Sequence, residues 1–183
     1  MKTKKVLPYY GEADFVKNVK LSSQFRKMGV MHFLIIKIKN YILSLLAYSC
    51  PINNYRVLFN KWRGVNIGSN VFIGLRCTLD HAYPEYIYIE DNVILSGDTY
   101  IVAHNKPSVY FRKKVPSFVA PVIIKKNSFI GVRSVILPGV TIGEGSFISG
   151  GAVIIENVPG NTVTRGNPGQ VIHHFLDKKD ISI

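Results

Sequence analysis

The sequence predicts a mainly β solenoid with one short strand every six residues, preceded by a helical segment. A small or β-branched residue stands four positions after the recurring aliphatic ones, as Cys77 does after Ile73. A period of six matches neither a helix nor the alternation of an ordinary strand, and a sandwich of Ile-rich strands does not keep a strict six. The aliphatic series comprises Ile67, Ile73, Leu79; Ile89, Leu95, Ile101; and Ile124, Ile130, Ile136, Ile142, Ile148, Ile154.

The repeat also predicts how the core is built. Three strands make one coil, so each large aliphatic side chain points inward and stacks on its equivalent eighteen residues later. Glycines such as Gly74 and Gly131 follow the aliphatic residue and allow the chain to turn the corner. A single coil cannot bury its apolar face alone, so neighbouring coils share the core.

Composition sets limits on domain count and partners. The chain has 183 residues, 47% hydrophobic and 19% charged, which suits one domain with a short appendage and excludes a wholly disordered chain. Cys50 and Cys77 cannot form a disulfide framework, so a reduced cytosolic setting is the simplest expectation. The net charge of +12 favours an anionic partner, either a lipid surface or a phosphorylated cofactor. Nucleic acid is not predicted, because zinc-finger spacing and RNP signatures are missing.

Residues 1–60 are expected to form an N-terminal helical extension. From Phe33 to Leu46 almost every residue is apolar, and Lys37, Asn40 and Ser44 form a narrow polar stripe. Two interpretations stay open: the helix packs on the solenoid or a neighbouring subunit, or it lies at the surface of an anionic membrane. A clean membrane span is not expected, because polar residues interrupt the apolar run.

Two insertions interrupt the six-residue period. His81–Tyr88 is short and Asn105–Pro121 is longer. Insertions in a solenoid emerge as loops on its faces and often carry function. We therefore expect a solenoid domain over residues 61–172 with a loop at 105–121, followed by a tail at 173–183.

Two stretches resemble a known family. Pro121–Ile172, which includes the closing sequence VPGNTVTRGNPGQVI, is similar to hexapeptide-repeat acyltransferases, and Ile89–Asn105 is similar to their sugar O-acetyltransferase branch, the maltose, galactoside, nodulation-factor and polysaccharide enzymes. The resemblance implies a left-handed parallel β-helix and a homotrimer with active sites between subunits. It also implies acetyl-CoA as co-substrate and no metal.

His104 is the predicted catalytic residue. A histidine can accept a hydroxyl proton near neutral pH, and His104 ends a strand where the long loop departs, at the position of the family's catalytic histidine. His81 is the rival and is otherwise assigned to the substrate cleft. Asp80, expected to face outward, resembles the family's carboxylate that binds a sugar hydroxyl, although it can equally be a solvated turn residue. Tyr83 and Asn105 are further substrate-binding candidates.

The resemblance also implies where coenzyme A binds. Glu156 and Gln170 depart from the family pattern, because they occupy positions that are often basic. Arg165, Lys125 or Lys126 is expected to supply that charge instead. The implied cofactor-binding residues are Val132, Gly150, Ile155, Glu156, Arg165, Gln170 and His173.

The predicted function is transfer of an acetyl group from acetyl-CoA to a hydroxyl of a sugar or glycan precursor, directly and with His104 as general base. The alternatives are a drug or amino-acid acceptor, or a non-catalytic membrane-associated assembly module. A zinc lyase resembling γ-type carbonic anhydrases needs three converging histidines, whereas the solenoid contains only His81 and His104. The expected location is cytoplasmic, with contact at the inner face of the membrane as an open alternative.

Overall fold

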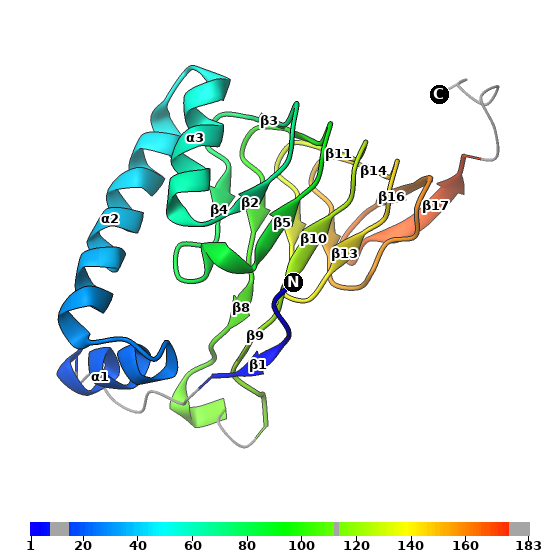
Figure 1. Ribbon diagram of the computed structural model, residues 1–183. Coiled ribbons are helices and arrows are strands. Elements are labelled where there is room, and N and C mark those ends of the chain that lie inside the picture. The colour runs from blue at the N-terminus through cyan, green and yellow to red at the C-terminus, as the bar shows by residue number, and fades with distance from the viewer. Residues whose placement is uncertain (8–14, 112–113, 176–183) are drawn as a thin grey trace.

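The computed structural model describes residues 1–7, 15–111 and 114–175, and its main body is a three-sided parallel β-helix (Figure 1). Strands from successive coils stack into three sheets, so the predicted parallel β-helix is confirmed. The first sheet contains β13 (Thr141–Ile142), β10 (Val122–Ile124), β5 (Ile87–Ile89) and β2 (Asn66–Ile67). The second contains β17 (Gln170–His174), β16 (Thr162–Arg165), β14 (Phe147–Ile148), β11 (Phe129–Ile130), β6 (Ile94–Leu95) and β3 (Phe72–Ile73). The third contains β15 (Val153–Ile154), β12 (Val135–Ile136), β7 (Tyr100–Ile101) and β4 (Thr78–Leu79).

The aliphatic ladder forms the core of the helix. Ile124 pairs with Ile142, and Ile136 pairs with Ile154, as the eighteen-residue spacing predicts. Except for the partly buried Ile67 in the first coil, the predicted inward residues are at most 2% exposed. Burying one such side chain contributes about 1.5–3 kcal/mol, so the ladder is the main source of stability.

The glycines at the corners have a different role from the predicted one. A Cβ added to Gly74 would lie 2.4 Å from the backbone nitrogen of Gly97 in the next coil, and one on Gly131 would lie equally close to that of Gly150. These positions need glycine because adjacent coils approach closely. The left-handed backbone conformation of the corner falls instead on residues such as Asn70 (φ 52°) and Asn127 (φ 61°).

Three helices cover one end of the β-helix (Figure 1). They are α1 (Phe15–Phe25), α2 (Val30–Ser49) and α3 (Asn53–Arg63). Pro51 follows the end of α2, and α3 ends at Gly64, which adopts the left-handed conformation with φ 103°. The sequence predicted the helical region, and α2 encloses the expected stretch from Phe33 to Leu46.

The burial of α2 is the reverse of an ordinary amphipathic helix. Its buried residues are Phe33, Asn40, Ser44 and Ala47, so two residues of the polar stripe face the protein. By length and composition α2 could cross a bilayer, although no clean span was expected, and 22% of its apolar window is buried.

The long insertion folds into a β-hairpin beside the corner that carries His104. In this hairpin β8 (His104–Asn105) pairs with β9 (Phe118–Val119), and β1 (Lys5–Val6) joins the other side of β9. All these pairs are antiparallel. His104 therefore lies on β8, the edge strand of a small sheet whose other two strands are β9 and β1. Within the predicted loop and tail, residues 112–113 and 176–183 lie outside the described part of the chain.

Candidate active site

His104 and Asp80 form the central pair of the site. His104 Nδ1 lies 2.6 Å from Asp80 Oδ2. Asp80 follows β4 and His104 follows β7, and these strands are neighbours, so consecutive coils bring the two residues together. The imidazole is 28% exposed and the carboxylate only 1%. With Nδ1 engaged by the carboxylate, Nε2 is the ring nitrogen left to meet a substrate.

Four hydrogen bonds hold the Asp80 carboxylate. Oδ1 accepts from the backbone N–H groups of Ala82 (2.8 Å) and Tyr83 (3.0 Å). Oδ2 accepts from the N–H of Ala103 (2.7 Å) as well as from the His104 ring. Burial alone would raise the pKa of Asp80, but the hydrogen bond and charge of His104 and the backbone donors outweigh it and hold that pKa below its usual value.

The expectation that Asp80 faces outward is wrong. The side chain turns inward because the insertion folds back over it and supplies the N–H groups of Ala82 and Tyr83. A carboxylate with both oxygens engaged is poorly placed to bind a sugar hydroxyl. Its geometry suits the orientation of the His104 ring instead.

Arg63 supports the backbone on which Asp80 stands. Arg63 as a whole is only 5% exposed. Its guanidinium donates to the carbonyl oxygens of Leu79 (2.9 Å) and Asp80 (2.8 Å) and to Asn60 Oδ1 (2.9 Å). Burial lowers the pKa of Arg63 to about 10, and the charge of Asp80 opposes that shift. Sequence reasoning missed Arg63, and only its place in a basic helix without acidic partners could have drawn attention to it.

The helices also hold the short insertion. Ser44 Oγ lies 2.8 Å from His81 Nδ1, and burial together with the charge of Arg63 lowers the pKa of His81. The side chain of His81 is thus joined to α2 rather than to Asp80 or His104. This contact fits a supporting role better than that of a general base.

Tyr83 lies between the end of α1 and the ring of His104. Its ring centroid is 5.4 Å from that of His104, and the Arg26 guanidinium lies 4.7 Å from its centroid. Arg26 also forms an ion pair with Glu85 (2.8 Å) and donates to the carbonyl of Ala82. Tyr83 is 8% exposed, so its side chain forms part of the wall of the site and does not extend into solvent.

The remaining substrate-binding candidate, Asn105, forms hydrogen bonds within the hairpin. Its Nδ2 donates to the carbonyl of Pro116 (3.2 Å), and Ser117 Oγ donates to its carbonyl oxygen (3.3 Å). Asn105 is half-buried next to His104. Asp80, His81, Tyr83, His104 and Asn105 therefore gather at one corner of the β-helix, where Asp80 and Tyr83 contact the His104 ring.

The predicted cofactor residues fall in three places. Val132, Gly150 and Arg165 lie at the same corner in successive coils, because they follow or end the neighbouring strands β11, β14 and β16. Ile155 and Glu156 follow β15, at the corner from which His104 departs in another coil. Gln170 and His173 are exposed on β17, where Gln170 pairs with Arg165.

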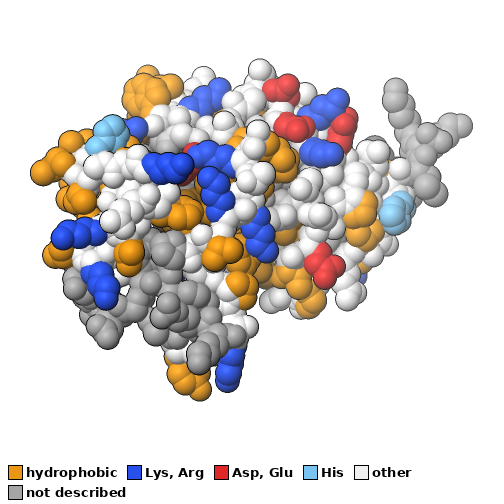
Figure 2. All heavy atoms as spheres, turned by 60° about the horizontal axis from the view of Figure 1, so that its bottom comes forward, with side chains coloured by type: hydrophobic (Ala, Val, Ile, Leu, Met, Phe, Trp, Pro, Cys, Tyr) orange, Lys and Arg blue, Asp and Glu red, His pale blue; other side chains and the backbone are white. Residues whose placement is uncertain are grey.

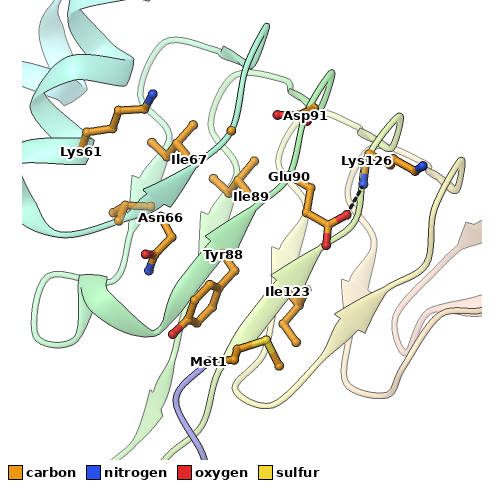
Figure 3. Close-up of a pocket in the computed structure, with 12 residues that line it drawn as sticks. Met1, Lys61, Asn66, Ile67, Tyr88, Ile89, Glu90, Asp91, Ile123 and Lys126 are labelled. Carbon is orange, nitrogen blue, oxygen red and sulfur yellow. Dashed lines mark hydrogen bonds between the residues drawn. The ribbon is translucent and has the colours of Figure 1, made fainter.

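A separate hollow lies on the outer face of the first sheet (Figure 3). Tyr88, Ile89, Glu90 and Lys126 line it, and the N–H of Lys126 donates to Glu90 (3.0 Å). None of its lining residues belongs to the predicted catalytic, substrate or cofactor set. Within the described residues, no three His, Cys, Asp or Glu side chains come together as a metal site.

Comparisons with known proteins agree with this architecture. The family model of bacterial transferase hexapeptide (six repeats) matches residues 121–156, and that of the hexapeptide repeat of succinyl-transferase matches residues 64–103. The chain is 31% identical to galactoside O-acetyltransferase of Escherichia coli over 123 residues, which cover 67% of this chain and 60% of that protein.

Two solved structures share the fold. The hexapeptide-repeat acetyltransferase VCA0836 of Vibrio cholerae, complexed with acetyl coenzyme A, superposes with a TM-score of 0.68 at 20% identity, covering 80% of this chain and 90% of that one. A maltose O-acetyltransferase of Clostridium difficile gives 0.63 at 23% identity, covering 79% and 88%. The six-residue repeat and the three-sided coil, with His104 and Asp80 at one corner, thus define the class of hexapeptide-repeat transferases. The chain belongs to the hexapeptide-repeat acetyltransferase family, close to the maltose and galactoside O-acetyltransferases.

Proposed function

We propose that this protein transfers an acetyl group from acetyl-CoA to a hydroxyl of a sugar or glycan precursor. The observation that carries the proposal is the His104–Asp80 pair, in which an imidazole that is 28% exposed lies 2.6 Å from a carboxylate that is 1% exposed. Solved structures of the same fold include one complexed with acetyl coenzyme A, and the galactoside relative supports a sugar acceptor.

In the proposed reaction the acceptor hydroxyl attacks the thioester directly. His104 Nε2 takes the hydroxyl proton as the oxygen bonds to the acetyl carbonyl carbon, and Asp80 stabilises the imidazolium that forms. A backbone N–H would stabilise the tetrahedral oxyanion. When the carbon–sulfur bond breaks, the same proton passes from His104 to the departing thiolate, which leaves as the free thiol of coenzyme A.

A covalent acyl-enzyme is not part of the proposal. Cys77, a cysteine of the solenoid, is 7% exposed, and its thiol donates to the carbonyl of Ser96 (3.0 Å). Burial raises the pKa of Cys77, which disfavours the thiolate that a nucleophile needs. Its position fits the small inward residue of the repeat.

Coenzyme A is proposed to lie along the solenoid wall between subunits of a homotrimer. Val132 and Ile155 are each 48% exposed, which makes them available to the pantetheine arm. Arg165 and Gln170 face one another across β16 and β17 and are proposed to meet the nucleotide end. Gly150, Glu156 and His173 complete the proposed cofactor set. Because the three groups are separated in one chain, a neighbouring subunit is needed to close the groove.

An acceptor screen tests this proposal. Purified protein is incubated with acetyl-CoA and sugars, sugar nucleotides, glycan repeats, amino acids or aminoglycosides, and the released thiol is measured. We expect release with a hydroxyl-bearing sugar acceptor and a loss of 10²- to 10⁴-fold, as an order of magnitude, in His104→Ala. Turnover only with an amino acid or drug would contradict the sugar acceptor, and unchanged turnover in the variant would remove His104 from the mechanism.

A further inference from the structure

The outward side of α2 is an exposed apolar stripe. Met31 is 71% exposed, Ile35 and Ile38 are each 60%, and Ile42 and Leu45 are each 51%. Their spacing of four, three, four and three residues places them on one face of the helix. Phe33, Asn40, Ser44 and Ala47 are buried on the other side of α2, so the exposed stripe is not the part of the helix that packs on the protein.

Helix α3 extends this surface with aromatic residues. Leu45 and Leu46 of α2 share a groove with Tyr55 and Phe59 of α3. Lys39 Nζ donates to the carbonyl of Trp62 (3.1 Å), which joins the two helices further along. Tyr55 is 51% and Trp62 is 56% exposed. We refer to Met31, Ile35, Ile38, Ile42, Leu45, Tyr55 and Trp62 together as the outer helical face.

The charge around the outer helical face is of one sign. Residues 15–63 contain nine Lys and Arg and no Asp or Glu. Among the lysines, Lys17, Lys20, Lys27, Lys39 and Lys61 are exposed. In Figure 2 the coloured side chains on the left, at the helical end, are mainly hydrophobic and basic. The large red patches of Asp and Glu lie on the right. Aliphatic, Tyr and Trp side chains beside lysines are the composition that interfacial helices present to anionic lipid.

We propose that the outer helical face docks the protein peripherally on an anionic lipid bilayer. Charge argues against a second copy of this chain as the occupant, because two such faces would bring together segments that contain cations and no acidic residue. An anionic bilayer instead attracts each nearby lysine by about 1 kcal/mol. Tyr and Trp are suited to the headgroup region, where their rings are apolar and their polar atoms stay wet.

The helix lies on the bilayer and does not cross it. Ser44 is 2.8 Å from His81, and the carbonyl of Tyr48 accepts from the N–H of Arg76 (3.2 Å). A spanning α2 would break these contacts and expose the buried Asn40 and Ser44 to hydrocarbon, where unpaired polar groups cost several kcal/mol each. Peripheral docking keeps the contacts and covers only the stripe.

Vesicle co-sedimentation of the full chain tests this inference. Vesicles of phosphatidylcholine with phosphatidylglycerol are compared with phosphatidylcholine alone. We expect binding to the anionic vesicles, and at least a tenfold lower partition coefficient for Ile42→Glu. Ile172→Glu is the matched control, because Ile172 has the same 51% exposure but lies on β17. Circular dichroism confirms that both variants are folded.

A charge variant distinguishes electrostatic docking from non-specific hydrophobic adsorption to the vesicles. Lys39→Ala should weaken partition about fivefold, whereas Lys125→Ala, an exposed lysine of the solenoid, should leave it unchanged. Salt at 1 M should release the protein, because the Debye length falls to about 3 Å.

Four outcomes would overturn the inference. They are the absence of sedimentation with anionic vesicles, equal binding to neutral vesicles, equal binding by folded Ile42→Glu, and resistance to alkaline carbonate, which would indicate a spanning helix. If light scattering shows that Ile42→Glu lowers the oligomeric mass, the face is an interface between copies and the inference also fails. Because no substrate is present, none of these results depends on the acetyltransferase proposal.

Discussion

Replacing Asp80 with asparagine tests the proposed catalytic pair most directly. The carboxylate accepts four hydrogen bonds, two at each oxygen. An asparagine whose Oδ1 stays with Ala82 and Tyr83 must turn its NH₂ toward the N–H of Ala103 and the ring of His104. The Ala103 donor is then left unpaired in a buried site, at a cost of about 1–3 kcal/mol. The opposite amide orientation leaves two donors unpaired and is worse.

The same amide would change the histidine tautomer. An NH₂ group donates to Nδ1, so the neutral ring must carry its proton on Nε2 and cannot accept the proton of the acceptor hydroxyl. In serine hydrolases an Asp-to-Asn change of this kind lowers kcat by about 10⁴-fold. We therefore expect Asp80→Asn to lose about 10³- to 10⁴-fold in kcat, far more than the loss in stability would cause.

The assay combines thiol release with thermal unfolding. For a chain of this size, 1–3 kcal/mol corresponds to a fall in Tm of roughly 2–12 °C. Asp98→Asn is the control, because the Asp98 carboxylate is bound by Arg76 at 2.6 Å, is 25% exposed and forms no hydrogen bond to His104. It should keep kcat within about twofold of the wild type. A folded Asp80→Asn protein with kcat within about threefold of wild type would refute the orienting role.

Three further predictions concern stability and support of the site. Arg63→Met should lower both Tm and kcat, because the carbonyls of Leu79 and Asp80 lose a charged donor worth about 1.5–3 kcal/mol per bond, whereas the exposed Lys61→Met should change neither. Ile136→Ala, at a fully buried position, should cost about 2–5 kcal/mol in urea unfolding, clearly more than Val135→Ala on the outward side of β12. The lowered pKa of Asp80 means that its stabilisation is present above its unfolded pKa, about 3.9, and is lost as the pH falls through the folded value. The Tm difference between wild type and Asp80→Asn should therefore be constant above about pH 5 and shrink as the pH falls below about 4, and a difference that does not shrink there would contradict the assignment.

The sequence was sufficient to predict the solenoid because its core is periodic. The inward position of Ile136 or Ile148 follows from counting in sixes, and their burial at 0% agrees with that count. His104 could be nominated as well, because it stands where the period stops and near the end of the segment Ile89–Asn105 that resembles the family. The direction of Asp80 could not, since it depends on how residues 81–86 fold. There the short helix Pro84–Tyr86 and the N–H groups of Ala82 and Tyr83 close over the carboxylate, and no periodicity encodes such a turn.

The helical segment shows why an apolar stripe alone does not give the orientation of a helix. The usual expectation places Ile35, Ile38 and Ile42 in the core and leaves the polar stripe in water. In α2 the arrangement is reversed, because Ser44 has a partner in His81 at 2.8 Å and lies on the same buried side as Phe33 and Ala47. This contact with the short insertion, which periodicity does not encode, helps to fix which side of α2 faces the protein. The apolar side is left free for a surface outside the chain, and the vesicle experiment identifies that surface.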